Sequence, residues 1–331
     1  MKKKSEHAIV VCCNPGYGFG LISSMNTQHY FGTDADWEIA YDYYTDEERQ
    51  KISDAFPFNV NWTPISDLMK DVVDKRTDRS PHGALNFYWL AYWLLAHRLL
   101  KEKKYKSVCV IQADTFVFVN LDELFKKADE GFLACSEYSF SHINADALPF
   151  GDDKAIWNRS MCGIFDAVTF IGQQYTKMPM DTVHFQEEDA FMGESNHSVI
   201  ALNRSVCRHG TKEKMIRLDR DLWSCDSIWP VTLLRLDGDK VFNSDNQQLS
   251  AWHCRWWQVG RVRSEWENNK KTILANSHRQ EYMRCFELQE SNYNLVKSFM
   301  ESFNAMKPEI ASDIYLKGTI RRPRYEDGEE G

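Results

Sequence analysis

The sequence predicts an α/β fold in which helices cover both faces of a parallel sheet. Three segments that read as strands, residues 8–13, 37–43 and 60–64, alternate with segments that read as helices. This β-α-β-α-β order, without a long interruption, is typical of a parallel sheet. A further run, residues 108–111, is continuously apolar, which indicates a strand buried on both faces of the sheet.

The composition is that of a globular protein. The chain has 331 residues, of which 43% are hydrophobic and 13% aromatic, so a substantial core can form. Its formal net charge of −8 argues against general binding to nucleic acid, because such binding requires a basic surface.

The cysteines and the apolar segments favour a cytoplasmic protein. The nine cysteines are an odd number without the paired spacing of zinc ligands, so reduced thiols are expected rather than a metal site or a disulfide framework. The basic start, MKKKSEHAIVVCC, has an apolar run too short for a signal peptide. Residues 84–96 are mostly apolar but too few to cross a bilayer, so no membrane span is expected.

Local signals place the expected helices. Thr45, with Glu48 three residues later, forms a capping-box pattern at the start of the helix after the second strand. A Ser-Pro pair precedes an aromatic-rich helix over residues 82–100, whose aromatic side chains are expected in the core. Asn120 or Asp122 is expected to cap the next helix.

Two strand ends carry residues suited to ligand binding. The first strand runs into a glycine-rich turn, NPGYGFG, and then a helix around residues 21–30. This arrangement suits phosphate binding, although the glycines match neither the dinucleotide fingerprint nor the P-loop. The strand at 108–111 is followed by Gln112 and Asp114 and then by a β-rich run over 115–119. Ligands of open α/β sheets bind at the carboxyl ends of strands, so a functional site is expected here.

The segment IQADTFVFVNLDELF, residues 111–125, resembles the metal-site segment of GT-A glycosyltransferases of the glycogenin and lipopolysaccharide-galactosyltransferase type. In that family an Asp-x-Asp pair follows an apolar strand and holds a divalent cation, which neutralises the diphosphate of a nucleotide-sugar. Here Gln112 replaces the first carboxylate and Asp114 keeps the second. The resemblance implies a GT-A, Rossmann-like fold with a mixed, mostly parallel sheet flanked by helices. The residues alone are also consistent with a buried strand and a turn that binds no metal.

Further matches to this family supply the rest of a donor site. Asn14 and Tyr17 fall in the family's Asp-x-x-Tyr segment, which contacts the nucleoside, with Asn14 in place of the Asp. His253, in AWHCRWW, matches the His that completes the metal site. Asp114 and His253 are therefore the expected ligands of Mn²⁺ or Mg²⁺, and Arg255 is a candidate partner for a phosphate. A histidine among tryptophans is as often a packed core ring.

Three consecutive carboxylates, Glu187, Glu188 and Asp189, lie at a predicted helix start in HFQEEDAFMGE. Glu187 and Asp189 match the family's Asp-Gln-Asp by position, and EED is also similar to the Glu-Asp pair of inverting GT-A enzymes. Asp189, with Glu188 beside it, is the candidate catalytic residue, either as general base or as a group that positions the sugar or acceptor. The helix dipole alone also favours carboxylates at this place.

The expected organisation is a GT-A domain over residues 1–262, a C-terminal helical extension over 263–315 and a flexible tail over 316–331. The expected activity is hexosyl transfer from a nucleotide-sugar, with a UDP-linked sugar as the donor. The acceptor is a glycan, a protein or a modified nucleobase, and the resemblance does not choose among them.

Three alternatives remain open from the sequence. The first is a catalytically impaired GT-A domain that binds nucleotide or glycan. The second is a glycosyltransferase acting on hydroxymethylated DNA bases, which would require a local basic channel. The third is a nucleotidyltransferase of the same fold class, which calls for a basic glycine-rich loop, whereas PGYGFG contains no Lys or Arg.

Overall fold

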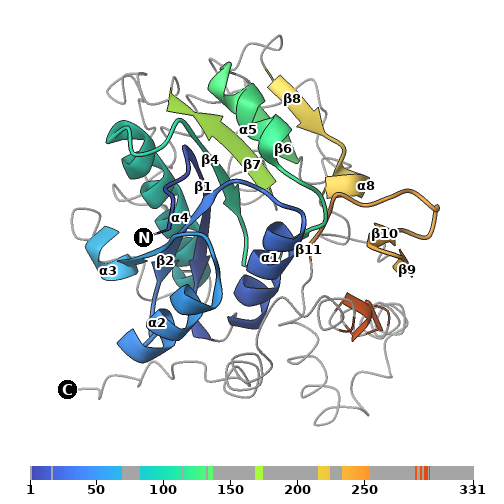
Figure 1. The fold of residues 1–331 in the computed structure, drawn as a ribbon, viewed down its shortest axis with the longest axis horizontal. Helices are drawn as coiled ribbons and strands as arrows, with labels where there is room; N and C mark the ends of the chain where they lie inside the picture. The colour runs from blue at the N-terminus through green and yellow to red at the C-terminus, as the bar shows by residue number, and fades with distance from the viewer. Residues whose placement is uncertain are drawn as a thin grey trace.

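A seven-stranded sheet lies at the centre of the protein (Figure 1). The computed structural model describes residues 2–15, 18–68, 83–113, 115–131, 133–136, 168–173, 215–223, 233–253, 288, 291–292, 294–296 and 298. The strand order is β3-β2-β1-β4-β7-β6-β8. The strands are β1 (His7–Cys13), β2 (Asp36–Tyr41), β3 (Val60–Pro64), β4 (Ser107–Ile111), β6 (Leu133–Ser136), β7 (Val168–Gly172) and β8 (Met215–Leu218).

The sheet is mixed and mostly parallel. β1 pairs in parallel with β2 and β4, and β2 pairs in parallel with β3. β7 is antiparallel to both β4 and β6, whereas β8 is parallel to β6. Among the described strands of this sheet, β7 therefore alone runs against the others. This confirms the predicted fold class, a mixed, mostly parallel sheet flanked by helices.

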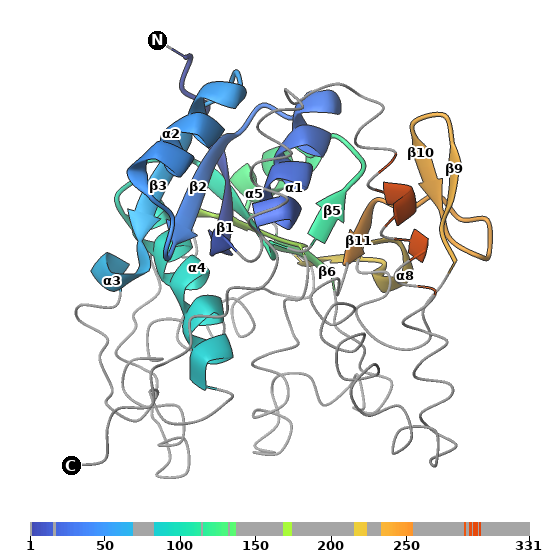
Figure 2. The same cartoon turned by 90° about the horizontal axis from the view of Figure 1, so that it is seen from below.

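Helices cover both faces of the sheet (Figure 2). One face carries α1 (Gly18–Tyr30), α2 (Asp46–Ala55) and α5 (Asp122–Asp129), and the other carries α3 (Ile65–Leu68) and α4 (Gly83–Lys101). Strand residues alternate between the two cores, as the pleat requires. On β1, Ile9 and Val11 pack on the α1 side, and Ala8 and Val10 pack on the α4 side.

The helix α4 carries the aromatic side chains that the sequence predicted to be core, and of these the structure describes Tyr92, which is buried. Its described side chains Ala91, Leu95 and Leu99 are buried against the sheet. Among the residues that the structure describes, no helix combines the length and apolar character that crossing a membrane requires.

Two predicted helix caps can be compared with the structure. The capping box at α2 is confirmed, because the Thr45 side chain accepts from the Glu48 amide and the Glu48 side chain accepts from the Thr45 amide. At α5 the prediction is wrong in detail, since Leu121 occupies the N-cap position. The Asn120 side chain instead accepts from the Asp122 amide at 2.8 Å, so it fixes the turn that leads into the helix.

A smaller layer joins the central sheet through a two-stranded ribbon. This ribbon pairs β5 (Thr115–Val117) with β11 (Ala251–His253) in antiparallel fashion, and a hairpin of β9 (Arg235–Asp237) and β10 (Lys240–Phe242) lies beside it, as does the short α8 (Arg220–Trp223). Phe116 and Trp252 are opposite each other in the ribbon and stack at 5.6 Å. Val296, in the predicted C-terminal extension, packs into the hydrophobic cluster that contains Phe116 and Trp252.

One edge of β5 pairs with β11, and along the other edge side chains of helix α1 donate hydrogen bonds to the carbonyl groups of β5. The Ser24 hydroxyl donates to the Thr115 carbonyl at 2.6 Å, and the Gln28 amide donates to the Val117 carbonyl at 2.9 Å. Both polar side chains are buried. They satisfy carbonyl groups that would otherwise be buried without partners, and so they hold β5 in place.

Candidate functional site

The order of the strands reverses between β1 and β4, and this is where open α/β sheets bind their ligands. β1 and β4 are parallel neighbours, with Val10 beside Val110. Asn14 follows the carboxyl end of β1 and Gln112 follows that of β4. The structure therefore brings these two predicted donor-site residues to the same edge of the sheet.

A tight turn connects β4 to the ribbon. The Thr115 amide donates to the Gln112 carbonyl at 3.0 Å, which closes a four-residue turn over 112–115. Asp114 falls within this turn but outside the described residues. The turn redirects the chain from the central sheet into β5, so Gln112 and Thr115 lie at the switch point of the strand order.

His253 lies directly opposite Thr115 in the ribbon. The two strands of the ribbon, β5 and β11, lie side by side in Figure 2. The Phe118 amide donates to the Ser250 carbonyl, and hydrogen-bonded pairs alternate along an antiparallel ladder. Thr115 and His253 therefore form a non-hydrogen-bonded pair, the type in which facing side chains are closest. The predicted metal ligand His253 is thus next to Thr115, the residue that follows Asp114. The His253 side chain is buried, with 5% of its surface exposed.

The carboxyl end of β2 contributes residues that the sequence analysis missed. The predicted strand 37–43 ends at Tyr41, so Asp42 and Tyr43 belong to the loop at the edge of the site. The Asp42 amide donates to the Cys13 carbonyl at 3.2 Å, next to Asn14. Tyr43 has a positive φ of 59° and is 56% exposed. A bulky residue such as Tyr43 is uncommon in this backbone conformation. The signal in the sequence that points to Asp42 is a carboxylate directly after the second strand.

Burial controls the chemistry of the groups around the end of β1. The Tyr44 hydroxyl donates to the Asn14 carbonyl at 3.2 Å and contacts the Cys13 sulfur at 3.4 Å. Burial raises the pKa of Tyr44 well above its usual range, and the neighbouring Cys13 adds to the effect. Burial also raises the pKa of the Cys12 thiol, helped by Cys13 and Asp42. Both groups stay protonated at neutral pH, so Cys12 offers no thiolate to a metal or a substrate.

The residues around the 112–115 turn fit a divalent cation of the Mn²⁺ type. His253 carries an imidazole and lies opposite Thr115, the residue after Asp114, and Gln112, two residues before Asp114, carries a neutral amide oxygen. Mn²⁺ accepts both oxygen and imidazole ligands. Within the described residues there is no group of three His, Cys, Asp or Glu side chains placed to hold a metal. Such a site would therefore need Asp114 and the oxygens of the donor substrate.

Several predicted site residues lie outside the described residues. They are Tyr17, Asp114, Glu188, Asp189 and Arg255. Their assigned roles stay predictions that rest on the sequence.

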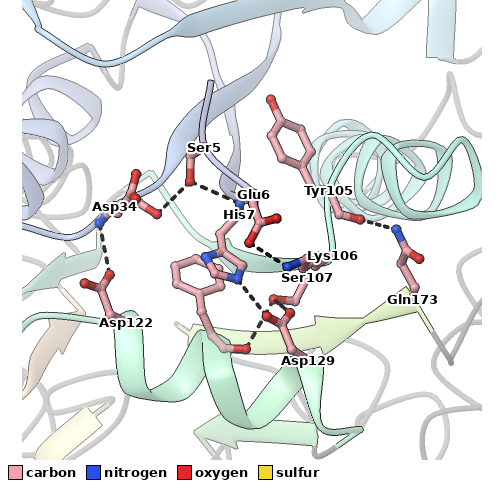
Figure 3. Close-up of polar contacts among 11 residues, drawn as sticks. Ser5, Glu6, His7, Asp34, Tyr105, Lys106, Ser107, Asp122, Asp129 and Gln173 are labelled. Atoms are coloured by element: carbon pink, nitrogen blue, oxygen red, sulfur yellow. Dashed lines mark hydrogen bonds and ion pairs between the residues drawn. The ribbon is translucent and has the colours of Figure 1, made fainter. Parts of the chain in front are cut away.

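At the opposite end of the sheet, Ser107, Asp129 and His7 form a cluster that superficially resembles a hydrolase triad (Figure 3). Asp129 accepts from the Ser107 hydroxyl at 2.7 Å and contacts the His7 Nε2 at 2.9 Å. In a nucleophilic triad the histidine lies between the serine and the carboxylate. Here the carboxylate lies between the other two, so the cluster ties α5 to the amino ends of β1 and β4.

A second polar cluster, around two buried carboxylates of β2, is also structural. The Tyr105 hydroxyl donates to Glu38 at 2.6 Å and lies 3.2 Å from an Asp36 oxygen. Lys104 forms an ion pair with Glu38 at 2.6 Å, and the Asn61 side chain donates to the same carboxylate. Buried carboxylates with this many donors are already satisfied and offer no open position for a ligand.

No protein-family model matches the chain, and no curated protein matches its sequence. Solved structures do resemble it. It is similar to WbbM, a bifunctional glycosyltransferase, at 11% identity and a TM-score of 0.44, over 76% of this chain and 46% of that one. The chain thus spans less than half the length of WbbM.

Two further similar structures cover more of the matched protein. Mouse xyloside xylosyltransferase 1 matches at 10% identity and a TM-score of 0.44, over 75% of this chain and 97% of that one. The galactosyltransferase LgtC, solved with donor and acceptor sugar analogues, matches at 10% identity and a TM-score of 0.37, over 66% of this chain and 75% of that one. All three of these proteins are described as glycosyltransferases.

Proposed function

We propose that this protein is a glycosyltransferase that moves a hexosyl group from a UDP-sugar to an acceptor hydroxyl. The observation that carries the proposal is the pairing of His253 with Thr115 at the end of the 112–115 turn. It joins a potential metal ligand from the far end of the chain to the strand end where α/β folds bind nucleotides.

The metal site in this proposal consists of Asp114 and His253, with Gln112 beside them. When bound, Mn²⁺ or Mg²⁺ supplies charge neutralisation for the diphosphate leaving group. The backbone of His253 is paired in the ribbon and its side chain is buried. Because Gln112 is neutral, the protein presents one negative charge fewer than an Asp-x-Asp pair, and ion binding depends more strongly on the nucleotide.

The nucleoside lies across the ends of β1 and β2 in this proposal. Asn14 and Tyr17 contact the base and ribose. Asp42, at the end of β2, accepts from ribose hydroxyls, which is the role of a carboxylate at this strand end in other nucleotide-binding α/β folds. Arg255 binds a phosphate.

Acceptor activation is assigned to the carboxylates at 188 and 189. Asp189 removes the proton of the attacking hydroxyl in an inverting reaction, or positions the sugar if the leaving phosphate takes that proton. Glu188 supports it. The acceptor is a glycan, a protein or a modified nucleobase.

One observation favours a second candidate function, a domain that binds nucleotide-sugar without turnover. Gln112 directly follows β4, where the resembling family has a carboxylate, and its amide contributes no charge. The two functions differ in whether the donor is ever cleaved.

The test combines binding with donor hydrolysis. UDP at about 100-fold excess over Kd, with Mn²⁺, should stabilise the protein by about 2.7 kcal/mol, which raises the melting temperature by about 5 °C. A panel of UDP-sugars with Mn²⁺ and without acceptor should then release UDP. Asp114→Asn should remove both effects, whereas Asp245→Asn, at an exposed position between β10 and β11, should change neither.

The outcomes separate the proposals. A melting shift with UDP release supports transfer, and a shift without release from any donor supports the binding domain. If no nucleoside diphosphate shifts the melting temperature with Mn²⁺ present, both functions are refuted.

A further inference from the structure

Thr115 carries a buried hydroxyl that the fold does not use. Its side chain has no exposed surface, and the Oγ1 atom has no hydrogen-bond partner in the part of the chain that the structure describes. The backbone of the same residue is fully paired, since its amide donates to Gln112 and its carbonyl accepts from Ser24. Burial of a hydroxyl without a partner costs free energy, so its presence requires an explanation.

The surroundings of this hydroxyl point to the candidate site. Side chains alternate along a strand, and Val117 and Ala251 of the ribbon pack into the core on the α1 side. Thr115 and His253 are two residues away from them on β5 and β11, so they lie on this same face, as a close non-hydrogen-bonded pair. The unused hydroxyl is therefore beside the buried imidazole and next in sequence to Asp114.

A second buried threonine, in the central seven-stranded sheet, provides a comparison. Thr169, in the middle of β7, is 1% exposed and its Oγ1 also lacks a partner in the described structure. It pairs with Val110, and its neighbour Ile171 packs on the α4 side. Thr169 thus shares the burial and chemistry of Thr115, but it lies on the α4 side of the central sheet, whereas Thr115 and His253 lie on the α1 side.

We propose that Thr115 is a positioning residue of the donor site, whose hydroxyl donates a hydrogen bond to an oxygen that binds beside His253. The oxygen belongs to the nucleoside diphosphate or to a water of the metal ion. The inference rests on the proposed function and adds a residue to it. The hydroxyl then has no partner in the empty site and gains one when the site is loaded.

This assignment predicts opposite effects of one substitution on stability and on binding. Valine has nearly the shape of threonine and carries no hydroxyl. Thr115→Val should therefore raise the melting temperature of the ligand-free protein by about 2 °C, because it removes a buried unpaired group. The same change should weaken binding of UDP with Mn²⁺ by about tenfold, as the loss of a group that orients a metal ligand typically does.

The experiment measures both quantities for three variants. Melting temperatures are recorded without ligand, and calorimetry gives the Kd of UDP with Mn²⁺. Thr169→Val should show the same gain in melting temperature with unchanged Kd. Thr115→Ser, which keeps the hydroxyl, should retain the wild-type Kd.

A further measurement identifies the oxygen that accepts the hydrogen bond from the Thr115 hydroxyl. Binding of Mn²⁺ alone, followed by its electron paramagnetic resonance signal, should weaken in Thr115→Val if the partner is a metal-bound water and stay unchanged if it is a diphosphate oxygen. An unchanged Kd for UDP with Mn²⁺ in Thr115→Val, or an equal loss in Thr169→Val, would overturn the inference while the proposed function stands. If the wild-type protein binds no nucleoside diphosphate, both fail together.

Discussion

Replacing Gln28 by methionine tests whether the polar side of α1 holds the site in place. Gln28 is only 2% exposed, and its amide donates to the Val117 carbonyl at 2.9 Å and to the Val119 carbonyl at 3.4 Å. Its side-chain oxygen accepts from the Thr33 hydroxyl at 2.7 Å. Methionine has a similar length and can make none of these hydrogen bonds.

The expected loss can be worked from these contacts. The Val117 carbonyl is fully buried, so leaving it without a partner should cost about 1–3 kcal/mol. The longer bond to Val119 and the half-buried bond to Thr33 should add about 1 kcal/mol, because water can reach these groups. The total is about 2–4 kcal/mol, which lowers the melting temperature of a chain of this size by about 4–8 °C.

Thermal and urea denaturation measure this loss, and the matched control is Gln50→Met. Gln50 lies on α2, where its exposed side chain contacts Asp54, so the same substitution should change stability by less than about 0.5 kcal/mol. Because β5 carries Thr115, Gln28→Met should also weaken the binding of UDP with Mn²⁺. Equal melting temperatures for the two variants would refute the idea that α1 replaces a neighbour strand of β5.

Three further predictions follow from the site and from the groups around it. Gln112→Asp should tighten the binding of Mn²⁺ in the absence of nucleotide, measured by calorimetry, because it adds a negative charge beside the predicted ligands; unchanged affinity would place Gln112 away from the ion. Stability should fall as the pH rises above about 9, because burial raises the folded-state pKa of Cys12 and Cys109 above the ordinary value of 9.0, so that the unfolded chain releases these protons first. Urea midpoints between pH 8 and 10.5 should show this slope, and Cys109→Ala should reduce it by up to about 1.4 kcal/mol per pH unit. Asp129→Asn should lower the melting temperature and leave UDP release unchanged, whereas a loss of turnover at normal stability would reopen the cluster with Ser107 and His7 as a reaction centre.

The sequence predicted the parallel strands β1 to β4 and their helices, because β1 and β4 are apolar and the helices carry local signals. Val60–Pro64 was placed at its observed bounds, and the Thr45–Glu48 capping box was found from two residues. These features depend on neighbours within a few positions along the chain. The antiparallel strand β7, between β4 and β6, depends on pairing between distant segments, and no local pattern specifies it.

The candidate site was less accessible to sequence reasoning. His253 lies opposite Thr115 because of the register in which β5 and β11 pair. The hydrophobic periodicity of the sequence does not determine that register. Asp42 was missed because the strand was extended two residues too far, into a segment of aromatic residues that favour strands. The buried polar residues Ser24 and Gln28 would be assigned to a solvent-exposed helix face, since their partners on β5 are unknown until the fold is seen.

The ribbon has a consequence for the order in which the protein assembles. β1 to β4 are made before the other strands and pair with one another, so four of the seven strands of the central sheet can pair while the rest of the chain is still emerging. Closure of β5 against β11 must wait until β6 to β10 have been made, because those strands lie in the intervening loop. Contacts that close such long loops form slowly. In a nascent chain β1 to β4 can therefore pair first, and Thr115 can pair with His253 only after residue 253 has been made.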